Sequence, residues 1–309
     1  MRIRSRMAAA VACLVTLAAC SYGDTEVPEY QEPEAAGASP ASCTTTEADL
    51  RSFAPSRDGG PAVRRIRDAG VLKVGVSGDT LLLGSRNPTT NEIEGFDIDI
   101  AQRIADELGV KLQKRVINAG DRIGLLQNRE IDLVARNMTI NCTRWQQIAF
   151  SAEYYHAGQK VLLRSDLAET YRGPQDLAGV TVCAPSGTTS IDNIRAEQPE
   201  AKAETALTHT GCLVKFQQGQ VDAITGDDTV LAGLAAQDKL YAEVPPQEPF
   251  TDEPYGIGAN AEDTDLVAFI NAVLEEMRSD GSWQKSYDRW LRPDLQGVDP
   301  LAFQPAYGR

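Results

Sequence analysis

Apolar and small residues alternate over 70–76, in GVLKVGV, and this spacing predicts a β-strand. The next regular segment, EGFDIDIAQRIADELGV, carries an apolar stripe from Ile100 to Leu108 at helical spacing. We therefore expect an amphipathic helix there, with Asp97 as its candidate N-cap and Gly109 as its end.

The same order of elements continues along the chain. A second strand is predicted from Val110, and RIGLLQNREIDLVA predicts a short helix followed by a strand over 131–135. Strands and helices therefore alternate, as is typical of an α/β domain. The pattern then returns: GVTVCAP at 179–185 resembles the opening strand, and FQQGQVD at 216–222 matches LQNREID at 126–132 in residue type. Two lobes of similar plan are the simplest interpretation.

Two apolar faces at helical spacing follow residue 260. Each predicts a helix, and Gly281 separates the two. We expect their bulky aromatic residues to pack against the core rather than to surround a ligand. The first face consists of Leu266, Phe269, Ile270, Val273, Leu274 and Met277, and the second of Trp283, Tyr287, Trp290 and Leu291.

The N-terminus has the pattern of an export signal. Three arginines precede an apolar run from Met7 to Ala19, which at roughly 13 residues is shorter than the ~20 that a bilayer span needs. The sequence LAAC at its end resembles the lipobox of bacterial lipoproteins, whose cysteine, here Cys20, receives lipid. A secretory signal with a chance cysteine is the alternative. We expect a signal peptide over 1–19 and a protein that is lipid-anchored to the outer face of the cell membrane.

Composition and charge limit the remaining chain. Residues 20–60 are rich in Pro, Glu, Ala, Ser, Thr and Gly, which predicts a flexible tether. About 250 residues remain, enough for one large domain or two ordinary ones. Loss of the signal would lower the formal net charge of −14 to about −17, and so acidic a protein is not expected to bind nucleic acid or anionic lipid headgroups.

Cysteine usage favours disulfides over a metal site. Of six cysteines, Cys13 would leave with the signal and Cys20 would carry the lipid. The other four lie outside the cytoplasm, where disulfides persist, and they allow three pairings. No CxxC motif or Cys/His cluster occurs, and only His156 and His209 are present, so we expect no metal and no cofactor. The four cysteines are Cys43, Cys142, Cys183 and Cys212.

Several spaced motifs follow one another in order over about 64–292. They are GFDIDIAQRIADELG, LLQNREIDLVARNMTINCTRWQQIAFSAEYYHAGQKVLL, DLAGVTVCAPSGTTSIDNI, FQQGQVDAITGDD, EPFTDEPYGIGA and SDGSWQKSYDRWL. This series resembles the polar amino-acid group of bacterial ABC-transporter solute-binding proteins, in particular the lipoproteins that bind glutamine, glutamate or aspartate. An ordered series is far more specific than one short pattern.

The resemblance implies an α/β fold of the two-lobed, type II periplasmic-binding-protein kind, with the ligand in the cleft between the lobes. The chain would cross between the lobes at 155–157 and again at 253–256, and hinge closure there would enclose the ligand. The expected bounds are 61–155 plus 256–292 for lobe 1, 156–255 for lobe 2, and 293–309 for a C-terminal tail.

The resemblance also implies groups for the carboxylate of an α-amino acid. Arg144 matches the family's arginine for this group, since a planar guanidinium offers two parallel donors. The backbone N–H of Thr139 should assist it. In lobe 2, SGTTS leads into an expected helix whose free N–H groups suit a carboxylate, and Gly187, Thr188 and Thr189 match family positions there.

Three further residues correspond to ligand contacts of the family. Asp227 matches the aspartate that receives the α-ammonium. Asn137 would offer its backbone carbonyl or its amide, at a position where the family often has glycine. Asp79 corresponds to an acidic residue of lobe 1 that contacts the ligand in some members. The alternatives are a salt bridge within lobe 1 for Arg144 and a turn beside Asp228 for Asp227.

The side-chain pocket departs from the family pattern. Many members have an aromatic-rich stretch after the first strand, where this chain has TLLLGSRNP. Pro185 stands where some relatives have a lysine that reaches the ligand side chain. Arg86 or Arg136 could serve an acidic side chain instead, or either could be an exposed or structurally paired arginine. We favour glutamate or aspartate as the ligand and keep asparagine and glutamine open.

The placement of the lobes also selects the disulfides. Cys183, which would end a strand of lobe 2, is expected to bond to Cys212, which would begin the helix packed nearby. Cys43, bonded to Cys142, would fasten the tether to lobe 1 and stabilise it by loop closure. A disulfide between the lobes would obstruct opening, which a reversible receptor must keep.

These features predict a substrate-binding lipoprotein of an ABC importer, a monomer that closes on a polar L-amino acid and delivers it to a membrane permease. An extracellular amino-acid sensor that signals through a membrane partner is the alternative. An enzyme on the same fold, such as a dehydratase, is a weaker one, because His156 at the hinge is the only candidate base. We expect no enzymatic activity.

Overall fold

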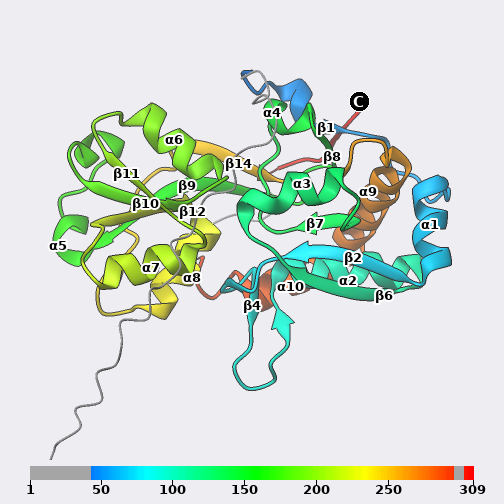
Figure 1. Ribbon diagram of the computed structural model, residues 1–309, viewed down its shortest axis with the longest axis horizontal. Helices are drawn as coiled ribbons and strands as arrows, with labels where there is room; N and C mark the ends of the chain where they lie inside the picture. Colours follow the sequence, from blue (N-terminus) through cyan, green and yellow to red (C-terminus); the bar gives the residue numbers. More distant parts are fainter. Residues whose placement is uncertain (1–42, 296–302) are drawn as a thin grey trace, which may run out of the picture. The chain divides into compact units, whose positions relative to one another are not determined.

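The computed structural model describes residues 43–295 and 303–309. The expected signal peptide, Cys20 and the first part of the expected tether lie outside these residues. Two mixed β-sheets and the helices packed on them form two α/β lobes (Figure 1), so the expected fold class is confirmed. In the described part of the chain, no helix combines the length and the apolar character that crossing a bilayer requires.

Lobe 1 is built on a five-stranded sheet. Its strands in spatial order are β6 (Lys111–Val116), β2 (Val71–Val76), β7 (Leu133–Ala135), β15 (Gly258–Asn260) and β8 (Ile148–Phe150). A three-stranded sheet consists of β3 (Asp79–Thr80), β4 (Gly84–Arg86) and β5 (Ile93–Glu94). The helices are α1 (Pro61–Ala69), α2 (Phe96–Leu108), α3 (Arg122–Gln127), α4 (Cys142–Trp145), α9 (Thr264–Ser279) and α10 (Ser282–Trp290).

Side chains of the five-stranded sheet face two separate apolar clusters. β2 runs parallel to β6 and β7, and successive residues of β7 point to opposite faces. Leu133 belongs to the cluster that contains Ile100 and Ile104 of α2. Val134, the next residue, packs instead with Leu126 of α3. Both faces of β7 are therefore packed against apolar residues. The loop after β7 starts from the end of this inner strand.

Lobe 2 contains one six-stranded sheet. Its path is β11 (Lys202–Ala206), β10 (Thr181–Pro185), β12 (Ala223–Asp227), β9 (Tyr155–Arg164) and β13 (Ala242–Glu243), and β14 (Thr251–Tyr255) also pairs with β9. Its helices are α5 (Ser165–Ala168), α6 (Thr189–Glu197), α7 (His209–Gln217) and α8 (Asp228–Gln237). Figure 1 shows α6 and α7 on opposite faces of the sheet. Strand β12 leads directly into α8, and a short turn joins the end of β10 to the start of α6.

Strands β9 and β14 are the two segments that join the lobes. They pair in antiparallel fashion, with Tyr155 opposite Tyr255. The ring centroids of these two tyrosines lie 5.7 Å apart. Trp283 and Tyr287 of α10 stack nearby at 5.6 Å, and both are buried. The expectation that these two α10 aromatics pack in the core is therefore confirmed.

The two lobes repeat one local design. The backbone N–H of Lys73 donates to the side chain of Asp132 at 2.9 Å, and the N–H of Asp132 donates to the carbonyl of Lys73 at 2.8 Å. Thr181 and Asp222 exchange the same two bonds in lobe 2, at 3.1 and 2.9 Å. The aspartates that end the two matching sequence segments therefore have the same structural role. Each forms hydrogen bonds between the start of one strand and its parallel neighbour, β7 with β2 in lobe 1 and β12 with β10 in lobe 2.

Helix α2 begins after Gly95 and not at Asp97. The φ of Gly95 is 145°, and a Cβ there would lie 2.3 Å from the carbonyl oxygen of Leu83, so this position requires glycine. The expectation that Asp97 is the N-cap is wrong, because its buried side chain accepts the backbone N–H of Asn137 instead. Gly109 ends the helix in the left-handed conformation, as predicted.

The described part of the expected tether, residues 43–60, packs against lobe 1. Strand β1 (Arg51–Ser52) pairs with β16 (Ala306–Tyr307), which comes from the expected C-terminal tail. The buried hydroxyl of Ser52 donates to the carbonyl of Phe150 at 2.7 Å. Composition did not reveal this, because strand pairing and a few buried polar contacts hold the segment, without an apolar periodicity.

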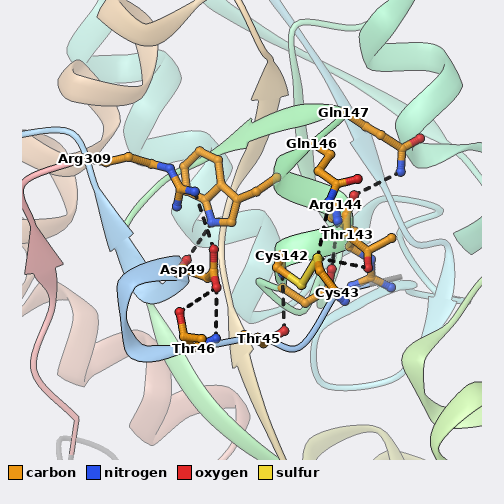
Figure 2. Close-up of a disulfide and its surroundings, with 12 residues drawn as sticks. Cys43, Thr45, Thr46, Asp49, Cys142, Thr143, Arg144, Gln146, Gln147 and Arg309 are labelled. Carbon is orange, nitrogen blue, oxygen red and sulfur yellow. Dashed lines mark hydrogen bonds and ion pairs between the residues drawn. A yellow bond between two sulfur atoms is a disulfide. The ribbon is translucent and has the colours of Figure 1, made fainter. Parts of the chain in front are cut away.

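Both expected disulfides are present, Cys43–Cys142 with an S–S distance of 2.04 Å and Cys183–Cys212 with 2.01 Å. Figure 2 shows the first of them beside Arg144. Trp145 of the same helix donates its indole N–H to the carbonyl of Asp49 at 2.6 Å. The N-terminal segment is therefore fastened to α4, the helix that carries Arg144.

Candidate functional site

A narrow cavity of about 10 Å³ lies between the two lobes, and we call it the cleft. Its walls come from the loop after β7, the starts of α3 and α4, the first turn of α6, the start of α7 and the end of β12. Six of the expected site residues line it. The lining residues are Arg122, Asn137, Thr139 and Arg144 from lobe 1, and Thr188, Thr189, Ser190, His209 and Asp227 from lobe 2.

Helix α4 positions Arg144 in the cleft. The side chain of Asn141 caps this helix by accepting the backbone N–H of Arg144 at 2.8 Å. The guanidinium is buried and donates through Nη1 to the carbonyl of Thr139 at 2.7 Å. Burial lowers the pKa of Arg144, although the carboxyls of Glu253 and Asp227 favour its charged form. Arg144 therefore presents a positive charge that no ion pair within lobe 1 satisfies among the described residues.

Glu253 joins the two lobes through residues that line the cleft, a role that no sequence pattern indicated. Its Oε2 accepts the hydroxyl of Thr139 at 2.6 Å and the hydroxyl of Thr189 at 2.7 Å. Its Oε1 accepts the side-chain amide of Asn193 at 2.8 Å. The only sequence signal was an acidic residue in an expected crossing segment, because Thr139, Thr189 and Asn193 all lie more than 50 residues away along the chain.

The start of α6 approaches lobe 1 closely. Gly187, just before this helix, has φ 73°, and a Cβ there would lie 2.7 Å from the Cα of Gly120 in lobe 1. The hydroxyl of Thr188 donates to the carbonyl of Pro185 at 2.7 Å and fixes the turn that leads into the helix. The first N–H groups of α6 are therefore presented at the cleft, where an anion can accept them.

Arg122 is a second arginine of the cleft that the sequence analysis missed. Its Nε donates to the carbonyl of Ala119 at 2.8 Å, and its Nη2 reaches the carbonyl of Gly187 in lobe 2 at 3.0 Å. Burial lowers its pKa well below the usual value, and the positive charges of Arg144 and Arg136 lower it further. In the sequence Arg122 is simply the first residue of a short helix, so nothing pointed to this role.

Asp227 lies at the end of β12. The phenol of Tyr255 donates to its Oδ2 at 2.6 Å, whereas its Oδ1 has no hydrogen-bond partner in the described part of the chain. Burial, and then the charge of Glu253, raises the pKa of Asp227 to about 8. A cation that approached Oδ1 would favour the ionised carboxylate.

Asn137 follows β7 in the left-handed region, with φ 32°. This conformation explains why glycine suits the position, and asparagine tolerates it better than most residues. Its backbone N–H donates to Asp97 at 2.9 Å, and the phenol of Tyr154 donates to the other oxygen of that carboxyl at 2.7 Å. Burial raises the pKa of Asp97 to about 6. Asp97 therefore holds the cleft loop in its strained conformation.

The structure does not bring Asp79 and Arg86 into the cleft. Both line a separate pocket at the boundary of the lobes. The carbonyl of Asp79 accepts the hydroxyl of Thr210 in lobe 2 at 3.1 Å. Arg86 is exposed and donates to the carbonyl of Asn91 within its own hairpin at 2.7 Å. Neither residue faces the groups that surround Arg144.

The two histidines have different surroundings. His209, which no sequence signal singled out, is buried in the cleft wall, and burial followed by the charge of Arg136 lowers its pKa to about 3. His156 is half exposed and lies outside the cleft lining. It contacts Glu153 at 2.7 Å and Asp252 at 3.3 Å, and its hydrogen bond to Glu153 raises its pKa to about 9. These contacts connect the two segments that cross between the lobes.

The cleft thus has polar groups of both signs at fixed places. Arg122, Arg144 and the start of α6 offer donors to an anion. Asp227 offers a carboxyl oxygen to a cation. Such a cavity can bind a small molecule that carries both an anionic and a cationic group.

Comparison with known proteins supports this interpretation. The chain is 39% identical over 233 residues to the ABC transporter glutamine-binding protein GlnH of Bacillus subtilis (strain 168), covering 74% of this chain and 84% of that protein. It is 33% identical over 253 residues to the glutamate-binding protein GluB of Corynebacterium efficiens, covering 78% of this chain and 85% of that protein. Both relatives are named as binding proteins and not as enzymes.

Solved structures agree with the fold. A mutant of ArgBP from T. maritima matches with a TM-score of 0.70 at 30% identity, over 74% of this chain and 98% of that one. The ancestral amino acid-binding protein AncCDT-1, a precursor of cyclohexadienyl dehydratase, matches with a TM-score of 0.69 at 31% identity, over 74% and 99%. The family model of bacterial extracellular solute-binding proteins, family 3, matches residues 72–293. The chain therefore belongs to the bacterial extracellular solute-binding proteins of family 3.

Proposed function

We propose that this protein is the ligand-binding component of an ABC importer and captures a polar L-amino acid in the cleft. One observation carries the proposal: Arg144 from lobe 1 and Asp227 from lobe 2 line the same small cavity. The carboxylate and ammonium of an α-amino acid need one group of each kind. The names of the relatives, which include binders of glutamine and of glutamate, support an amino acid as the ligand.

In this proposal Arg144 binds the α-carboxylate. Its guanidinium is already oriented by the carbonyl of Thr139 and by the cap of α4, so little ordering is required on binding. The backbone N–H of Thr139 and the N–H groups at Gly187, Thr188 and Thr189 would add donors from both lobes. A carboxylate at this place would be held by both lobes at once.

Asp227 binds the α-ammonium. Its Oδ1 is buried and unpartnered among the described residues, so it can accept one ammonium hydrogen. Asn137 has an unpartnered Oδ1 in the wall of the same cleft and can accept a second. Asp79 and Arg86 are left out of this ligand set, because they line a separate pocket and not the cleft.

Hinge closure would enclose the ligand. We propose lobe 1 as 61–155 plus 256–292, lobe 2 as 156–255, and movement about β9 and β14 where they cross. The hydroxyls of Thr139 and Thr189 meet across the lobes at 3.3 Å, a contact that needs the lobes to be close together. We further propose a monomer, anchored by lipid at Cys20 on the outer face of the membrane, that passes its ligand to a membrane permease.

Titration calorimetry tests the binding proposal. A soluble form that begins at Cys43, the first residue that the structure describes, should be titrated with each common amino acid. We expect heat of binding for polar L-amino acids and none for their D-forms, since the positions of Arg144 and Asp227 are fixed. A protein that gives no heat with any amino acid would refute the proposal.

A further inference from the structure

Arg136 is a buried arginine whose guanidinium makes no hydrogen bond within the described residues. It follows β7 directly and is 1% exposed. Its Nε, Nη1 and Nη2 all lack a hydrogen-bond partner in the part of the chain that the structure describes. An ionised side chain in such a place is costly unless an anion accepts its donors. The exposed Arg86, the other candidate for an acidic side chain, already donates to Asn91.

The nearby carboxyls do not supply this anion. Asp97 and Asp79 favour the charged form of Arg136, but burial still lowers its pKa. Both oxygens of Asp97 are engaged by other donors. Oδ1 of Asp79 accepts the hydroxyl of Ser77 at 3.1 Å. These carboxyls favour the charged form of Arg136 and leave its planar fork of donors without a hydrogen bond among the described residues.

Arg136 does not line the cleft itself, but it neighbours residues that do. Asn137, the next residue, lines the cleft, and the backbone carbonyl of Arg136 accepts Nη1 of Arg122 at 3.3 Å. His209 lines the cleft from lobe 2 and is close enough that the charge of Arg136 lowers its pKa. Nδ1 of His209 is also buried without a partner among the described residues. Two unsatisfied polar side chains, one from each lobe, therefore interact electrostatically beside the cleft.

We propose that Arg136 binds the side-chain carboxylate of the ligand and makes the cleft selective for a dicarboxylic amino acid, glutamate or aspartate, over its amide. This inference rests on the proposed function, since Arg144 and Asp227 must first hold the α-carboxylate and α-ammonium. A carboxylate accepts two parallel hydrogen bonds from a guanidinium. The amide of glutamine or asparagine has only one acceptor oxygen for the guanidinium, and its NH₂ group turns donors towards a buried cation.

His209 fits the same ligand group. Because it stays neutral, it can add a hydrogen bond to a carboxylate without adding a second positive charge beside Arg136. The names of the relatives do not decide the ligand, because both glutamine-binding and glutamate-binding proteins occur among them. The deciding feature is the unsatisfied guanidinium itself.

The test compares acids with amides in the unaltered protein and in two variants. Glutamate, aspartate, glutamine and asparagine are titrated by calorimetry against the wild type, Arg136→Gln and Arg86→Gln. We expect the wild type to bind at least one of the two acids about 30-fold or more tightly than its amide. Arg136→Gln should lose about 30-fold or more for that acid and less than about tenfold for the amide. Arg86→Gln, which removes the same charge from an exposed hairpin, should leave both affinities unchanged.

Thermal unfolding without ligand separates binding from structure. Because Arg136 is buried without a hydrogen bond or ion pair to any described residue, Arg136→Gln should keep or raise the melting temperature, whereas loss of a structural ion pair would lower it. A wild type that binds no amino acid refutes the proposed function and this inference with it. A wild type that binds amides as tightly as acids refutes this inference alone. Equal loss for acid and amide in Arg136→Gln, or a lower melting temperature, also overturns it.

Discussion

Ligand binding should release a proton, and the affinity should therefore rise with pH between 6 and 8. Burial, followed by the charge of Glu253, raises the pKa of Asp227 to about 8, so most of the ligand-free protein carries this carboxyl protonated at pH 7. An α-ammonium needs the ionised carboxylate as its acceptor. The proton on Asp227 must therefore leave when the ligand binds.

The size of the effect follows from the pKa. Well below the pKa of Asp227, each pH unit changes the ionised fraction of this carboxyl about tenfold, which corresponds to about 1.4 kcal/mol. The affinity should rise about 50-fold from pH 6 to pH 8 and level off above that, with about 0.9 proton released per ligand at pH 7. His209 does not titrate in this window, because its pKa is lowered to about 3. Asp97 and Asp228, each with a pKa raised by burial to about 6, contribute only at its acid end.

Calorimetry at pH 6, 7 and 8, in phosphate and in Tris, measures both the affinity and the number of protons released. Asp227→Asn is the matched control, since it keeps the shape of the side chain and removes the titrating group. Its affinity should be weaker and independent of pH across this window. An unaltered protein with constant affinity from pH 6 to 8, or a variant with the same slope as the wild type, would show that Asp227 does not bind the ammonium.

Three further changes test other parts of the site. Arg144→Ala should weaken binding by about 2 to 5 kcal/mol by titration and leave the fold intact by circular dichroism, and unchanged affinity would make this arginine structural. Glu253→Gln should move the pH dependence of affinity to lower pH, because Glu253 raises the pKa of Asp227; an unmoved profile contradicts that coupling. Cys43→Ser opens a disulfide with a sequence separation of 99, so urea denaturation should show a loss of about 4 kcal/mol, and a loss below about 1 kcal/mol argues against loop closure.

Local patterns predicted most of the fold. Alternation at β2, the apolar stripe of α2 and the stop at Gly109 depend only on neighbouring residues, and they were confirmed. The N-cap of α2 was wrong, because Gly95 is required by the carbonyl of Leu83, which comes from a separate strand connection. The ordered segment 43–60 was missed for the same reason: its partners lie at residues 142–150 and 303–309.

The sequence by itself predicted the alternation of strands and helices, the likeness of the two lobes and Arg144 as a candidate binding residue. Each of these depends on spacing within one segment. Only the tertiary structure decided which charges of the cleft have partners. Glu253 is satisfied by hydroxyls from both lobes, whereas Arg136 has no acceptor in the described structure. Whether a buried charge is paired depends on residues brought together from distant segments, and no local spacing records that.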